Sequence, residues 1–205
     1  MKRIIITLVA LVCVLTSTFA YAEQAVFDKS VFEGLEGYEA YEDGAYSYGA
    51  SYMSASFIDM MGGKTDHSIQ MAIGFQSFTD AVYIDPYFNV FNWDLYGAQK
   101  WSIRTVTLTV DDAVIQYEWV GSTENGAMLI LTEKSKEALE LISKTKTMTI
   151  TISNDTEKSV AEIDEGTVKL FAEVAGNILK HDVISHVSPS AKKNADEAVV
   201  ITITK

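Results

Sequence analysis

Apolar and polar residues alternate with a period of two over most of the chain, which is the pattern of half-buried β-strands. The clearest run is Ile69–Gln76, in which Ile69, Met71, Ile73 and Phe75 share one side of the predicted strand. The same pattern predicts further strands at residues 51–59, 81–84, 87–93, 103–110, 113–120, 127–131, 147–153, 160–163, 183–187 and 198–204. Strands are therefore expected to supply most of the core.

Two segments repeat their apolar residues at intervals of three and four, which predicts amphipathic helices. The first is Glu133–Ser143, and the second is Gly166–Lys180 with Asp164 as its expected N-cap. Turn signals such as Asp111-Asp112 separate neighbouring strands, and no strand–helix alternation persists. The expected fold class is therefore mainly β: an antiparallel β-sandwich or flattened barrel with two peripheral α-helices.

Residues 23–205 contain no repeat, low-complexity tract or long linker, so we expect a single β-rich domain. Within it, residues 23–52 are rich in glycine, tyrosine and acid, and we expect an irregular acidic segment or edge strand there. Ser188–Asn194, which contains Pro189, is expected to be a loop.

Residues 1–22 contain the parts of a secretory signal peptide in the required order. Lys2-Arg3 precedes the apolar run Ile4–Leu15, and Ala20-Tyr21-Ala22 supplies the cleavage pattern. The run is shorter than the roughly 20 residues that span a bilayer, which favours cleavage over an uncleaved anchor. A lipoprotein signal is the other alternative, but Cys13 lies inside the apolar run. We expect an exported protein (periplasmic, cell-surface or secreted) without a transmembrane span after cleavage.

The charge of the chain limits its partners. The net charge is −12, which becomes −14 when Lys2 and Arg3 leave with the signal. Residues 23–99 hold 12 acids and two bases, so most of the negative charge lies in the first half of the mature chain. An acidic surface repels phosphate backbones, which argues against nucleic-acid binding. The only cysteine, Cys13, leaves with the signal, so the mature chain has no thiol chemistry.

The irregular acidic segment carries a dense group of tyrosines. Aromatic side chains supply large contact area at low entropic cost, so an exposed group of them suits a glycan, a peptide or an envelope protein. Because the intervening glycines make burial of every ring difficult, we take these residues as the candidate ligand-binding site: Tyr38, Tyr41, Tyr46, Tyr48 and Tyr52.

A second aromatic run lies within residues 83–101. We interpret it as core, with alternate rings filling the sandwich and tyrosine hydroxyls reaching its rim; exposed binding aromatics are the alternative. Its members are Tyr83, Tyr87, Phe88, Phe91, Trp93, Tyr96 and Trp101.

No catalytic, metal-binding or nucleotide-binding motif stands out. The Gly62–Thr65 stretch lacks the first glycine of a phosphate loop, because Ile58 occupies that position. His67 has no motif that locates a nucleophile beside it. His181 and His186 are five residues apart, whereas helical zinc pairs use four. We therefore expect no catalytic residue, no metal and no cofactor, and we place His181 at the C-terminus of the second helix.

Adjacent acids occur at Asp111-Asp112, Asp164-Glu165 and Glu42-Asp43. Such acids in turns are usually solvated, and sequence alone does not show which distant acids converge. Three functional hypotheses follow. The favoured one is an exported, non-catalytic binding or accessory protein of a bacterial-type cell envelope or exterior. The alternatives are a secreted hydrolase that uses two carboxylates, and a structural or assembly subunit that pairs through an edge strand such as Ala198–Thr204.

Overall fold

The computed structural model describes residues 28–42, 44–64, 67–77, 84–94, 102–124, 126–187 and 189–205. The expected signal peptide, residues 1–22, lies outside the described residues, as do Tyr83, Tyr96 and Trp101. Within those ranges no helix combines the length and the apolar character needed to cross a bilayer.

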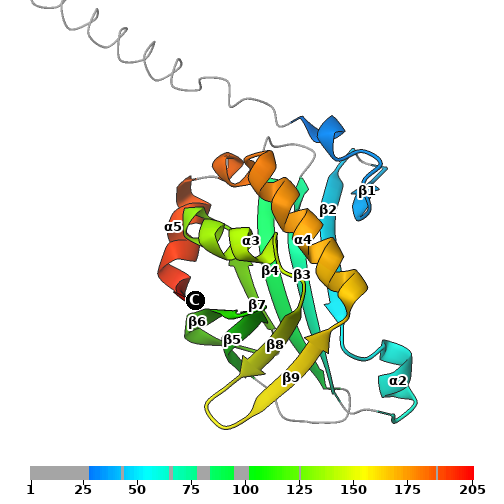
Figure 1. The fold of residues 1–205 in the computed structure, drawn as a ribbon, viewed down its shortest axis with the longest axis vertical. Helices are drawn as coiled ribbons and strands as arrows, with labels where there is room; N and C mark the ends of the chain where they lie inside the picture. The colour runs from blue at the N-terminus through cyan, green and yellow to red at the C-terminus, as the bar shows by residue number, and fades with distance from the viewer. Residues whose placement is uncertain are drawn as a thin grey trace, which may run out of the picture.

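Two antiparallel five-stranded sheets form a sandwich-like fold (Figure 1). The first sheet has the order β1-β2-β3-β4-β7, and the second has the order β10-β6-β5-β8-β9. The strands of the first sheet are β1 (Tyr38–Ala40), β2 (Tyr46–Met53), β3 (His67–Ser77), β4 (Ile84–Asp94) and β7 (Gly126–Ile130). Those of the second are β5 (Ser102–Val110), β6 (Ala113–Glu124), β8 (Met148–Ser153), β9 (Lys158–Ile163) and β10 (Val199–Thr204). The mainly β prediction is therefore confirmed.

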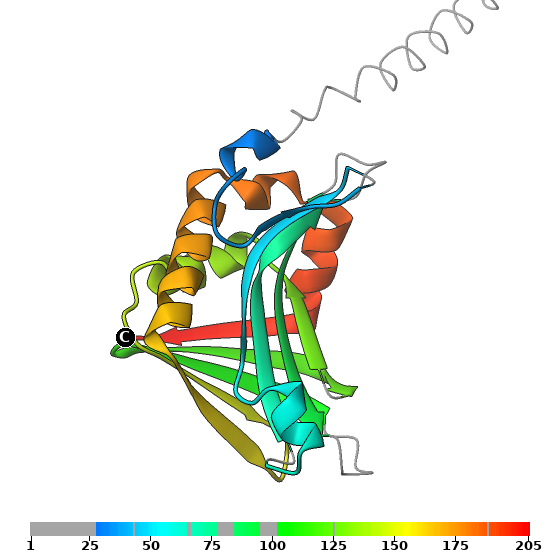
Figure 2. The same cartoon turned by 90° about the vertical axis from the view of Figure 1, so that its right-hand side faces the viewer.

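The two sheets diverge at one side, and helices occupy the space between them there (Figure 2). The two helices expected from the apolar spacing are present as α3 (Lys136–Ile142) and α4 (Glu165–Lys180). The remaining helical elements are η1 (Lys29–Val31), α2 (Phe57–Met61), η2 (Glu133–Ser135), η3 (Val183–His186) and α5 (Pro189–Ala198).

The inner faces of the sheets form the core because the period-two pattern places one apolar set inward on each strand. Ile69, Met71, Ile73 and Phe75 of β3 are all buried, as the sequence predicts. The ring of Phe88 on β4 stacks on that of Tyr117 on β6, with centroids 4.8 Å apart and planes 18° apart. This aromatic pair joins the two sheets across the core.

Helix α4 is placed by its cap and by its buried face. The Asp164 side chain accepts a 3.0 Å hydrogen bond from the backbone N–H of Thr167, which confirms the expected N-cap. Val168, Phe171, Val174, Ala175 and Ile178 are buried between α4 and the sheets.

Local expectations near the N-terminal half are corrected by turn chemistry. The segment expected to be irregular or an edge strand contains two regular strands, since β1 at the sheet edge pairs antiparallel with β2. The strand expected at 51–59 ends at Met53, and α2 follows because Ser56 caps it by accepting a 3.1 Å hydrogen bond from Asp59 N–H.

The expected break at Asp85-Pro86 is absent. β4 continues through Pro86, which pairs with Phe75 of β3, while β7 pairs with β4 from Tyr87 to Phe91. Among the described residues no strand lies beside Pro86 on the β7 side, which is the edge setting that tolerates proline.

The segment after α4 also differs from expectation. Where a strand is expected at 183–187, residues 183–186 form the 3₁₀ helix η3, after a left-handed turn at Asp182 (φ 49°). Within the loop expected at 188–194, residues 189–194 instead belong to α5, which begins at Pro189. Proline suits the first helical position because its fixed φ is helical and its missing N–H has no partner there.

Candidate functional site

The five tyrosines of the sequence-derived candidate site do not form one exposed surface. Tyr46 and Tyr48 are buried in the core, and Tyr38 and Tyr52 are half-buried against it. Only Tyr41 is well exposed, at 48%. The reason is register: even-numbered residues of β2 point inward, so alternation rather than glycine content decides the burial of Tyr46 and Tyr48.

The aromatic residues of β4 take the opposite arrangement. Of those described, Phe88 alone lies in the core, while Tyr87, Phe91 and Trp93 face outward. The interpretation of this run as core filling is therefore corrected for these three residues. They share odd numbers on a continuous strand, and Phe88 and Val90 take the inner face. We call Tyr87, Phe91 and Trp93 the β4 aromatic row.

Phe91 and Trp93 form a paired platform at one end of this row. Their ring centroids are 5.8 Å apart and their planes are 30° apart. The indole N–H of Trp93 donates a 2.9 Å hydrogen bond to Oε1 of Gln70 on β3, which fixes the indole over the neighbouring strand. Phe91 lies over Gly126 of β7, where any Cβ would collide with its ring. Trp93 remains 38% exposed.

Tyr87 lies across a pair of glycines at the other end of the row. Gly74 of β3 pairs with Tyr87, and Gly49 of β2 pairs with Gly74, so the three residues form one line across the sheet. A Cβ placed on Gly49 would lie 3.3 Å from the Tyr87 hydroxyl oxygen. Both glycines thus provide the flat floor on which the ring of Tyr87 rests.

Polar groups border the Tyr87 end. The Tyr41 hydroxyl lies 3.2 Å from Oε2 of Glu39, to which it donates, and 3.0 Å from Oγ of Ser47. Burial, with the nearby Tyr41 and Glu39, raises the pKa of the Tyr87 hydroxyl. The hydroxyl of Tyr87 therefore stays protonated at neutral pH and retains a proton to donate.

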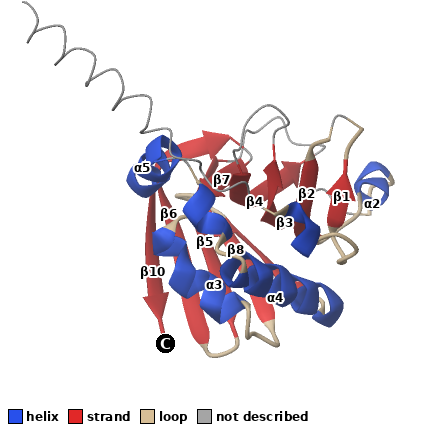
Figure 3. Cartoon of the chain, turned by 90° about the horizontal axis from the view of Figure 1, so that it is seen from above, coloured by secondary structure: helices blue, strands red, loops and turns tan. Residues whose placement is uncertain are grey.

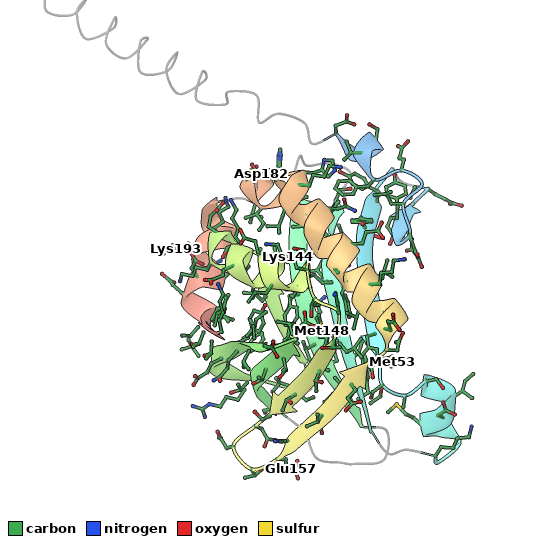
Figure 4. All side chains as sticks on the ribbon, in the orientation of Figure 1. Met53, Lys144, Met148, Glu157, Asp182 and Lys193 are labelled. Atoms are coloured by element: carbon green, nitrogen blue, oxygen red, sulfur yellow. The ribbon has the colours of Figure 1, made fainter. Side chains whose placement is uncertain are left out.

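Asn89 lies in the same outward row, between Tyr87 and Phe91. Its side-chain Oδ1 is buried and has no hydrogen-bond partner among the described residues. Such unpaired acceptors are rare in native structures because each costs roughly 1–3 kcal/mol. Met128 on the neighbouring strand β7 is 58% exposed, and exposed Met53 lies two strands from β4, at the lower end of β2 beside α2 (Figure 4).

The face that carries the row is open on the described structure. Helices α3 and α4 lie on the other side of the first sheet, and β2 and β3 bend at their upper ends toward the side away from α4 (Figure 2). Five outward positions of β2 and β3 hold small residues, so the β4 rings stand beside a low floor there: Ser47, Gly49, Ser51, Ala72 and Gly74. The larger outward side chains of these two strands are Met53, Gln70 and Gln76. This face can stack on flat apolar ring surfaces and exchange hydrogen bonds at its edges.

The adjacent acids predicted from sequence have structural roles. The Asp111 carboxylate accepts hydrogen bonds from Lys146 N–H (3.1 Å), Thr147 N–H (2.9 Å) and the Thr147 hydroxyl (3.1 Å). Burial opposes ionisation of Asp111, but these hydrogen bonds outweigh it and lower its pKa. Hydrogen bonds from Thr167 likewise lower the pKa of Asp164. A general acid of a glycosidase needs a raised pKa, so neither carboxyl suits that role.

A depression of about 530 Å³ beside the first turn of α4 adjoins one of about 440 Å³. Lys146 and Glu165 line both. At the start of α4 the Asp164 carboxylate accepts hydrogen bonds from the N–H and the hydroxyl of Thr167, so a negative charge already lies at this helix end.

His181 is the C-cap of α4, as expected, and its ring lies 5.1 Å from that of Phe32. Burial, and then the nearby charge of Lys180, lower its pKa. Over the described residues, no three or more His, Cys, Asp or Glu side chains gather in a way that suits a metal ion.

The chain matches no protein-family model, and no curated protein or solved structure shows significant similarity to it.

Proposed function

We propose that the protein is exported and acts as a non-catalytic binding protein of the cell envelope or exterior, with a neutral glycan as its ligand. The observation that carries this proposal is the β4 aromatic row on an open sheet face. Sugar rings present apolar C–H faces, which stack on aromatic rings, and their hydroxyls pair with amide and hydroxyl groups. Trp93, Phe91 and Tyr87 supply the rings, while Gln70 and Tyr41 supply polar groups beside them.

The charge of the chain supports a neutral ligand. The net charge is −12, and residues 23–99 hold only two bases against 12 acids. At physiological ionic strength such a surface repels polyanions at close range. An uncharged polysaccharide is not repelled in this way, and the negative charge of the chain disfavours the binding of competing anions.

A retention assay tests the proposal. Residues 23–205 are passed over cellulose, chitin and mannan, with polygalacturonate as the anionic comparison. We expect retention on at least one neutral polysaccharide and none on polygalacturonate. Phe91→Ala and Trp93→Ala should each weaken retention about tenfold, equivalent to roughly 1.4 kcal/mol.

Ile58→Ala is the matched control, because Ile58 is a highly exposed apolar residue on α2, outside the row. This variant should bind like the wild type. Failure to retain the protein on any neutral polysaccharide, or equal effects of Trp93→Ala and Ile58→Ala, would overturn the proposal.

A further inference from the structure

A strand at the border of a sheet leaves backbone N–H and C=O groups unpaired, and proteins usually protect such edges from pairing with other chains. In the described part of the chain, β1 and β7 border the first sheet, and β9 and β10 border the second. β1 is protected by its length of three residues. On β7, the carbonyl of Met128 accepts a 3.4 Å hydrogen bond from the indole N–H of Trp119.

β9 is protected in two ways. Its charged residues Lys158 and Glu162 make strand addition costly. In addition, the Tyr52 hydroxyl donates a 2.9 Å hydrogen bond to the carbonyl of Glu162, so one backbone group of this edge is already engaged. Three of the four border strands therefore carry a recognisable protective feature.

β10 lacks all of these features. Its six residues, Val199–Thr204, include no charge, proline or glycine, and every one favours a strand. Val200 is 56% exposed, and Ile201 and Ile203 are only partly buried at the border of the core. Figure 3 shows β10 as the outermost strand of its sheet, and no described element lies beyond it.

We propose that this edge pairs with β10 of a second copy of the chain, so that the two second sheets become one continuous antiparallel sheet across a twofold axis. A pairing centred on Ile201 or on Thr202 places residues of the same parity opposite each other. Ile201 and Ile203 of both copies then stay on the inner face, where each copy covers the exposed border of the other's core. On each free edge, roughly three backbone N–H donors and three C=O acceptors then gain hydrogen-bond partners.

The chemistry of the edge favours a copy of the same strand over a charged or polar partner. The chain carries 28 acids, yet none lies within Val199–Thr204, so two copies meet at an uncharged line. A twofold interface requires a self-complementary surface, which a uniform strand of Val, Ile and Thr provides. This inference is independent of glycan binding, which uses the other sheet.

Sedimentation velocity of residues 23–205 over a concentration series tests the proposal. Two six-residue strands bury less area than a standard interface, so we expect a dimer with a Kd on the order of tens of micromolar. Added salt should strengthen the dimer, because it screens the repulsion between two chains of net negative charge. Backbone amides of β10 should gain protection from hydrogen exchange as concentration rises, whereas those of β9 should not.

The double variant Val200→Lys, Thr202→Lys places lysines of the two copies opposite each other in either pairing, and it should weaken dimerisation at least tenfold. Val160→Lys is the matched control: Val160 is 53% exposed on β9 and, with Lys158, gives the same pair of lysines on the opposite edge. It should dimerise like the wild type. A wild-type protein that stays monomeric at the highest concentration, or equal weakening by both variants, overturns the proposal.

Discussion

The side-chain amide of Asn177 on α4 donates a 2.7 Å hydrogen bond to the hydroxyl oxygen of Tyr48 on β2. Tyr48 is fully buried, so this bond lies inside the contact between the helix and the first sheet. Burial raises the pKa of the Tyr48 hydroxyl, although the Asn177 bond opposes that effect. A residue taken from sequence as part of a binding surface is thus a structural anchor.

Tyr48→Phe should lower the free energy of unfolding by about 1–2 kcal/mol, because the Asn177 amide loses its partner in a partly buried position. Urea denaturation measures the change. Asn177→Ala in the Tyr48→Phe background should cost less than Asn177→Ala alone, which a double-mutant cycle resolves. Strictly additive effects would show that the two groups do not interact.

Phe88 and Phe91 lie on opposite faces of one strand, so the same truncation should have very different effects. Phe88→Ala removes the ring stacked on Tyr117 and should destabilise the fold by about 3–5 kcal/mol. Phe91→Ala removes a partly exposed ring from the outer face and should cost about 1 kcal/mol or less. Thermal and urea unfolding measure both. A similar loss for the two variants would contradict the inward and outward assignment on β4.

Gly74→Ala tests the close approach of β2 and β3. A Cβ on Gly74 would collide with the carbonyl of Tyr48 and lie 2.6 Å from Cα of Gly49. The strands must separate, so stability should fall by about 1–3 kcal/mol. Gly176→Ala is the opposite case. Gly176 lies inside α4, and a Cβ there would be 3.9 Å from Cβ of Ser143, the C-cap of α3, which is ordinary contact. That variant should gain about 0.5–1 kcal/mol, and a loss there would contradict the helix assignment.

Stability should fall in acid partly through Asp111. Hydrogen bonds overcome the opposing effect of burial and hold its folded-state pKa below the unfolded value of about 3.9. The stabilisation is therefore fully present above pH about 4, and it is lost as the pH falls through the folded-state pKa. Asp111→Asn should be less stable at pH 7 and lose less stability between pH 6 and pH 3. Asp112→Asn, outside this set of hydrogen bonds, should keep the wild-type stability at pH 7.

Much of the architecture follows from the period of the apolar residues. The strands at 103–110, 113–120 and 147–153 and the two amphipathic helices match the structure within a few residues. Local turn chemistry is less predictable from sequence. Pro189 is typical of a loop yet starts α5, and Ser56 carries no pattern that distinguishes it as the cap of α2. Both residues are compatible with more than one backbone path, so sequence alone did not discriminate.

The candidate site in the structure differs from the one expected from sequence for a different reason. Dense tyrosine content drew attention to residues 38–52, yet inward register buries Tyr46 and Tyr48. The useful signal was the parity of residues 87, 91 and 93 against the apolar pair Phe88 and Val90. This parity is informative only if one strand continues through Pro86. The tertiary structure decides that, because β7 pairs with β4 only from Tyr87 to Phe91.

The sequence by itself determined which residues share a face of a strand or helix, because side-chain direction follows from backbone periodicity alone. It also determined the net charge of the chain, since composition does not depend on fold. Only the tertiary structure decided which of two faces meets the core, which strands lie at a border, and which protect their edges. Those outcomes depend on contacts between residues far apart in the chain, such as Tyr52 with Glu162 and Phe88 with Tyr117.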